Sequence, residues 1–124
     1  MAIDWEKPCG SQMKYEQIRD FVQMFADRLG FYPMIYGGHA IRESKQLRDG
    51  DALFAKCPIW YQSSTLTPAK LPTRTWAAYT LWQYDDEHRK NGAPPPHVLN
   101  GVDWSRFNGT FEQLKNEWPF AGPV

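Results

Sequence analysis

The 124-residue sequence has no excess of charge of either sign. It contains 14 basic and 14 acidic residues, so its formal net charge is zero. Nucleic-acid binders and proteins of anionic membrane surfaces usually carry a basic excess, which is missing here. No apolar run approaches the roughly 20 residues that a membrane-spanning helix needs. The first residues, Met1 to Asp4, have neither the basic start nor the apolar stretch of a secretory signal. We therefore expect neither nucleic acid nor a membrane as a partner.

Cysteine is scarce, and the common catalytic motifs are missing. Cys9 and Cys57 are the only two cysteines. The sequence does not show whether they pair, and we expect buried free thiols. His39, His88 and His97 have no spacing typical of a metal site. The chain also lacks a Gly-x-Ser-x-Gly elbow and a glycine-rich phosphate loop. We expect no metal and no cofactor.

Aromatic residues are abundant instead. Six Trp, six Tyr and seven Phe make up 15% of the chain. Large rings can build the core of a small domain, or they can line a groove on which sugars stack. We expect about two thirds of them in the core and the others in a cleft.

Hydrophobic periodicity predicts a single α/β domain over residues 1–124. Residues 2–6 are typical of a strand and 32–36 of a second one. Between them, apolar residues recur at helical spacing over 13–29, with Ser11 as the predicted N-cap and Gly30 at the end. A strand, a helix and a strand at this spacing predict parallel strands joined by a right-handed crossover.

Further elements follow along the chain. The 41–53 stretch predicts one short helix or two turns. Residues 59–62 predict a third strand, and 63–74 a loop. The 75–84 stretch is apolar on both faces, as in a strand covered on both sides. Residues 98–103 predict a last short strand and 111–118 a closing helix.

Polar and aromatic residues gather where these predicted strands end. In a parallel sheet or barrel the carboxyl ends meet at one edge, where active sites lie. Carboxylates there suit proton transfer, rings suit stacking on sugars, and amides suit binding of hydroxyls. The residues at these ends are Asp4, Glu6, Tyr36, Tyr61, Gln62, Gln83, Tyr84, Asp85 and Asp103.

Asp4-Trp5-Glu6 is the most informative of these groups. Because strand side chains alternate, Asp4 and Glu6 point to the same side while Trp5 points into the packing. A rise of roughly 3.3 Å per residue separates their Cα atoms by about 6.6 Å. Two carboxylates at such a separation can act on one glycosidic bond. An isolated pair could equally be a solvated strand end, but the other strand ends favour a site.

The order of these motifs resembles glycoside hydrolase family 25 (GH25), the Chalaropsis-type lysozymes. The resemblance is carried by the segments Ile3–Glu6, Pro33–Gly38, Ile59–Tyr61, Leu81–Tyr84 and Val102–Asp103 with Phe107. It covers the C-terminal part of the family domain. The implied fold is a partial (β/α) TIM-like barrel of about five mostly parallel strands, with one long and one or two short helices. The first strands of the barrel are absent.

The resemblance implies an N-acetylmuramidase that cleaves the β-1,4 bond between N-acetylmuramic acid and N-acetylglucosamine in peptidoglycan. Glu6 matches the general acid and Asp4 its partner carboxylate, while Asp103 matches a further catalytic acid. Tyr36, Tyr61, Trp82, Gln83 and Asp85 would line the sugar cleft. Ser105 stands where the family usually has Asn. The implied site of action is extracellular or at the cell wall.

Two other readings remain open. A half-barrel could pair with a second copy of itself, which would cover the open edge of its sheet. Alternatively, a non-catalytic carbohydrate-binding module could use Trp60, Trp76 and Trp82 as stacking platforms. The paired acids Asp4 and Glu6 argue against the module, because stacking needs no carboxylates.

Overall fold

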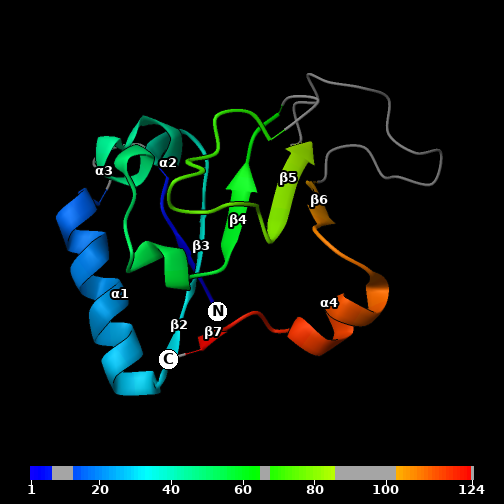
Figure 1. Cartoon of the computed structure of the whole chain (residues 1–124), viewed down its shortest axis with the longest axis horizontal. Helices are drawn as coiled ribbons and strands as arrows, with labels where there is room; N and C mark the ends of the chain where they lie inside the picture. The colour runs from blue at the N-terminus through cyan, green and yellow to red at the C-terminus, as the bar shows by residue number, and fades with distance from the viewer. Residues whose placement is uncertain (7–12, 65–67, 86–102, 124) are drawn as a thin grey trace.

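An open, mostly parallel β-sheet forms the centre of the molecule. A computed structural model describes residues 1–6, 13–64, 68–85 and 103–123. Within these ranges the sheet has five strands in the order β1-β3-β4-β5-β6 (Figure 1). The first four are parallel, and β6 is antiparallel to β5. Their bounds are β1 (Ala2–Asp4), β3 (Met34–Gly37), β4 (Ile59–Gln62), β5 (Leu81–Asp85) and β6 (Trp104–Phe107). The two edge strands, β1 and β6, do not pair in the described part of the chain, so no closed barrel forms there.

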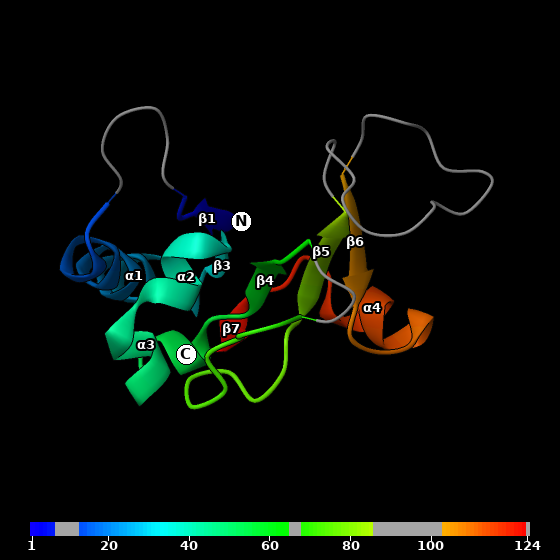
Figure 2. The same cartoon turned by 90° about the horizontal axis from the view of Figure 1, so that it is seen from above.

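Helices lie toward both ends of this strand order. Helices α1 (Tyr15–Leu29), α2 (His39–Glu43) and α3 (Lys45–Asp49) lie near β1 and β3, and α4 (Phe111–Glu117) lies near β6 (Figures 1 and 2). A short 3-10 helix, η1 (Phe54–Lys56), precedes β4. A separate antiparallel pair joins β2 (Phe31–Tyr32) to β7 (Gly122–Pro123). Among the described helices, none combines the length and apolarity needed to cross a membrane.

The predicted strand–helix–strand unit is confirmed. β1 and β3 are parallel neighbours, with Ile3 opposite Ile35 and Asp4 opposite Tyr36. Gly30 ends α1 in the left-handed conformation (φ 77°), which glycine adopts without a Cβ penalty. The predicted N-cap was wrong. Lys14 precedes the first helical residue and its amide donates to Gln17 Oε1 (2.8 Å), while Ser11 lies outside the described residues.

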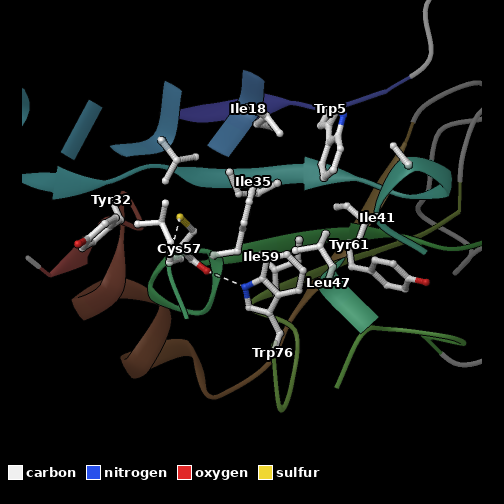
Figure 3. Packing of buried hydrophobic residues seen from close by; sticks show 14 of the residues in the cluster. Trp5, Ile18, Tyr32, Ile35, Ile41, Leu47, Cys57, Ile59, Tyr61 and Trp76 are labelled. Atoms are coloured by element: carbon white, nitrogen blue, oxygen red, sulfur yellow. Dashed lines mark hydrogen bonds between the residues drawn. The ribbon is translucent and has the colours of Figure 1, made fainter. Parts of the chain in front are cut away.

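The long strand predicted over 75–84 was wrong in its first half. Only Leu81–Asp85 forms β5, and the amides of Thr75 and Trp76 instead donate to the carbonyl of Pro72. Trp76 is 5% exposed, and its Nε1 donates to the carbonyl of Cys57 (2.9 Å; Figure 3). The first half of this apolar stretch is therefore a turn in which Thr75 and Trp76 are buried, while Ala77 and Ala78 are exposed. Of the strand predicted over 98–103, residues 98–102 lie outside the described residues, and Asp103 precedes β6.

The two faces of the sheet have different roles. Ile35, Ile59, Tyr61 and Trp82 belong to a buried cluster that includes Ile18 and Val22 of α1 (Figure 3). The alternate positions carry Tyr36, Trp60 and Gln83. Because side chains alternate along a strand, one face builds the core and the other remains for a site.

Gly37 marks the point where β3 passes closest to the chain that leaves β1. A Cβ on Gly37 would lie 2.6 Å from the carbonyl oxygen of Trp5 and 3.1 Å from Ile41 Cδ1. We expect Gly37→Ala to lower the free energy of unfolding by about 1–3 kcal/mol, because the backbone must move apart. Urea denaturation followed by circular dichroism measures this loss.

Gly30→Ala is the matched control. Nothing lies within 4 Å of a Cβ there, so its cost comes from the left-handed backbone alone, about 1 kcal/mol. An unchanged unfolding free energy in Gly37→Ala would contradict the close approach.

Candidate active site at the carboxyl edge of the sheet

The candidate site lies on the sheet face opposite the core, toward the carboxyl ends of the parallel strands. Strand register sets this face: Asp4 lies opposite Tyr36, and Tyr36 opposite Trp60. Toward the other edge of the sheet, Gln83 on β5 lies opposite Ser105 on β6. Residues in register on neighbouring strands point to the same side. The face thus presents Asp4, Tyr36 and Trp60 in one row, and Gln83 and Ser105 in a second row two residues further along the strands.

Asp4, Trp5 and Glu6 alternate as predicted. Trp5 is 3% exposed, and its Nε1 donates to the carbonyl of Met13 (2.8 Å). Its backbone amide donates to the carbonyl of Tyr36 (2.8 Å), which extends the β1–β3 ladder one residue past the strand. Asp4 and Glu6 are both exposed. The buried Trp5 therefore anchors the chain between two carboxylates that stay accessible.

The hydroxyl of Tyr36 is the centre of this arrangement. It donates to Gln83 Oε1 (2.5 Å), a side chain that is itself buried. Burial raises the pKa of Tyr36 above its ordinary value, and the charge and hydrogen bond of Glu6 add to this effect. The charges of Asp4 and Asp103 act in the same direction. Tyr36 therefore stays protonated at neutral pH, and the charges of three carboxylates raise the pKa of its hydroxyl. We call Asp4, Glu6 and Asp103 the acid cluster.

Asp103 reaches this edge by a route that differs from the prediction. The sequence pattern placed it at the end of a strand, whereas in the structure it immediately precedes β6. Because β6 runs antiparallel to β5, with Trp104 opposite Asp85, the start of β6 lies at the carboxyl end of β5. Asp103 therefore lies at the same edge as Asp4 and Glu6, which precede it by nearly one hundred positions in the chain.

Trp60 is the site residue that the strand-end argument missed. It is half-buried, its ring meets that of Tyr36 edge to face at 4.9 Å between centroids, and its Nε1 donates to Ser105 Oγ (2.9 Å). Alternation within β4 was the available signal. Ile59 and Tyr61 are buried, so Trp60 must face the other way.

Two predicted cleft residues lie on the core face instead. Tyr61 is fully buried, and its hydroxyl donates to the carbonyl of Ala69 (2.5 Å). Trp82 is 7% exposed, and its Nε1 donates to the carbonyl of Ser63 (3.0 Å). Both were assigned to the cleft from their place near the end of a predicted strand, which ignored the face on which each side chain lies. Trp76 is buried as well, so of the three proposed stacking platforms Trp60 alone lies on the site face.

The remaining candidates do not add a metal or a nucleophile. Asp85 is the last residue of β5, and its side chain is outside the described part of the structure. Cys57 is a buried free thiol, as expected, and burial raises its pKa to about 12, so it stays unreactive. Cys9 lies outside the described residues. Across the described ranges, no three His, Cys, Asp or Glu side chains are grouped closely enough to hold a metal ion.

Comparisons of this chain with protein-family models, with curated proteins and with solved structures give no match.

Proposed function

We propose that this chain is part of a GH25-type muramidase domain that hydrolyses the β-1,4 bond between N-acetylmuramic acid and N-acetylglucosamine in peptidoglycan. The observation that carries the proposal is the acid cluster. Asp4, Glu6 and Asp103 come from opposite ends of the chain and all act on the hydroxyl of Tyr36. Separate carboxylates on one face suit glycoside hydrolysis, in which one donates a proton and another stays ionised.

The architecture supports this proposal. Four parallel strands place their carboxyl ends at one edge, and the acids lie at that edge. Active sites of parallel α/β barrels occupy the same position. We infer a partial (β/α) TIM-like barrel whose inner face carries Tyr36, Trp60 and Gln83.

In the proposed mechanism, Glu6 donates its proton to the oxygen of the leaving sugar as the glycosidic bond breaks. The carbonyl oxygen of the substrate's own N-acetyl group forms the new bond to the anomeric carbon. Asp4 stays ionised and stabilises the positive charge that develops on the acetamido group and the ring. Water then opens this cyclic intermediate, giving its proton back to Glu6. No covalent bond to the enzyme forms.

Neighbouring side chains would orient the sugar. Gln83 is 3% exposed, so its part is to hold the hydroxyl of Tyr36 in place through their hydrogen bond rather than to contact the sugar. The half-buried Trp60 ring, held by its bond to Ser105, offers an apolar surface to a sugar face. The Trp60 ring binds substrate, whereas the acids act on the bond.

Analysis of the cleavage products tests the proposed bond specificity. Peptidoglycan digested by the chain is reduced with borohydride, and its new ends are identified by mass spectrometry. We expect reduced N-acetylmuramic acid, because the proposed bond leaves that sugar at the new reducing end. Reduced N-acetylglucosamine, or no new reducing ends, would contradict the proposed reaction.

A second candidate is a non-catalytic half-barrel that binds peptidoglycan and pairs with a second copy. The exposed edge of β1 and the exposed apolar residues Phe21, Met24 and Leu29 of α1 favour it. Binding to walls without new reducing ends would support this candidate over the hydrolase.

A further inference from the structure

A basic pocket lies apart from the acid cluster. Its volume is about 460 Å³, and it lies between α2, α3 and the 68–74 segment. Four cationic residues line it together with one acidic residue, Glu43. The cations are Arg42, Arg48, Lys70 and Arg74, and we call the pocket that they line the basic pocket. Four of the 14 basic residues of a chain with zero net charge therefore meet in one place.

Within the described residues, no ion pair joins a cation of the basic pocket to an acid. Ion pairs in the described part of the chain join Arg19 to Asp51, Lys45 to Asp49 and Lys115 to Glu112. None of these pairs includes a cation of the basic pocket. Glu43 lines the pocket, and the charge of Asp49, which pairs with Lys45, also interacts with Arg48 and Arg74. Four cations still outnumber these two acids, so the pocket keeps a positive charge that favours an anion.

The walls of the pocket are held in place by hydrogen bonds. On one side, Arg42 Nη1 donates to the carbonyl of Gln62 (2.7 Å), and its guanidinium lies 5.8 Å from the centre of the Tyr61 ring. On the other side, Thr75 Oγ1 donates to the carbonyl of Leu47 in α3 (2.6 Å) and accepts from the amide of Asp51 (3.1 Å). This fixes the spacing of the two walls before any ligand binds.

The hydroxyl of Tyr61 also anchors the 68–74 segment through its bond to the carbonyl of Ala69. Lys70 follows in the left-handed conformation (φ 60°), which is uncommon for a residue with a side chain. Pro72 is buried beneath the segment. The segment is thus a shaped wall that carries Lys70 and Arg74.

We propose that the basic pocket binds a phosphate group. Three guanidinium groups offer planar pairs of N–H donors that match phosphate oxygens, and the Lys70 ammonium adds a further charge. Several cations suit the two charges of a free phosphate, or the successive single charges along a phosphodiester chain, better than a single carboxylate. The phosphate could be a free ion or a unit of a polyol phosphodiester chain. The volume of the pocket leaves room for the polyol part of such a unit. This site shares no residue with the acid cluster, so it is independent of the proposed hydrolase.

Calorimetric titration at low salt tests the site, with inorganic phosphate and a glycerol phosphate oligomer as probes. The variant is Arg48→Gln with Arg74→Gln, because both residues are exposed and their side chains make no hydrogen bond within the described part of the chain. We expect its dissociation constant to rise about tenfold or more. Added salt should weaken binding by the wild-type chain more than by the variant.

The control is Arg28→Gln with Arg106→Gln, which removes the same charge from exposed positions elsewhere. It should bind like the wild type. Equal affinity for both probes would identify free phosphate as the ligand, and tighter oligomer binding the phosphodiester chain. The proposal is overturned if neither probe binds, or if the control loses as much affinity as the pocket variant. A near-ultraviolet circular dichroism spectrum of each variant verifies that the fold is kept.

Discussion

Glu6→Gln is expected to lower the rate of cell-wall lysis by about 10²–10⁴-fold, the usual contribution of a general acid. Glutamine has nearly the same shape as glutamate, so the packing beside Tyr36 should be kept. It cannot donate a carboxylic proton to the leaving sugar. The loss should therefore appear in the rate of bond cleavage, while wall binding stays close to that of the wild type.

Glu117→Gln is the matched control for this substitution. Glu117 is an exposed glutamate at the end of α4 and does not belong to the acid cluster. Turbidity loss of a wall suspension measures lysis for the three proteins side by side. Unchanged lysis in Glu6→Gln would remove Glu6 from the mechanism, and an equal loss in Glu117→Gln would show that the effect is not specific to the site.

A second measurement of the same variant does not depend on activity. The charge and hydrogen bond of Glu6 contribute to the raised pKa of Tyr36. Glu6→Gln should therefore lower the pKa of Tyr36, although burial, the largest cause, keeps it above the ordinary value. An alkaline titration of tyrosinate absorbance detects this change. If the titration of the variant matched that of the wild type, the placement of Glu6 beside Tyr36 would be wrong.

The sequence predicted which edge of the sheet carries the candidate site better than it predicted which residues line that site. Alternation and the strand–helix–strand spacing placed Asp4, Glu6 and Tyr36 together, because these are local rules acting on neighbouring parallel strands. The assignment of Tyr61 and Trp82 failed because a strand end fixes the edge but not the face. The same alternation, applied strictly to β4, would have selected Trp60 instead.

Tertiary packing decided the features that local patterns did not. The apolar run before β5 has the composition of a strand, yet Trp76 packs against the turn at Cys57 and the chain bends there. The antiparallel direction of β6 is set by its pairing with β5, and this pairing joins residues that are far apart in the sequence. Asp51 is the clearest case: it lies in a stretch that predicted only a short helix or turns, and it became a buried polar centre.

Asp51 joins three parts of the fold through one carboxylate. Its Oδ1 accepts from the amides of Leu53 (2.8 Å) and Phe54 (3.1 Å), which shapes the turn into η1. Its Oδ2 accepts from the hydroxyl of Tyr15 and from Arg19 Nε (3.2 Å), both on α1. Its side chain is 6% exposed. Burial alone would raise the pKa of Asp51, but these hydrogen bonds outweigh it and lower the pKa.

Asp51→Ala is expected to lower the free energy of unfolding by about 3 kcal/mol or more, because the buried amides of Leu53 and Phe54 lose their acceptor. Asp51→Asn should cost less, since its amide oxygen can still accept from those two amides while its nitrogen cannot pair with Arg19. Urea denaturation measures both. Asp49→Ala, an exposed aspartate on α3, is the control and should leave stability close to that of the wild type. A similar loss in both alanine variants would contradict the central role of Asp51.

The pH dependence of stability separates the charge of Asp51 from its shape. The folded pKa is lowered, so the stabilisation is complete above the unfolded value of about 3.9 and is lost as pH falls through the folded pKa. Between about pH 7 and pH 3, the unfolding free energy of the wild type should therefore fall more steeply than that of Asp51→Asn, which has no proton to take up there. Parallel curves for the two proteins would mean that the hydrogen bonds of Asp51 do not depend on its ionised form.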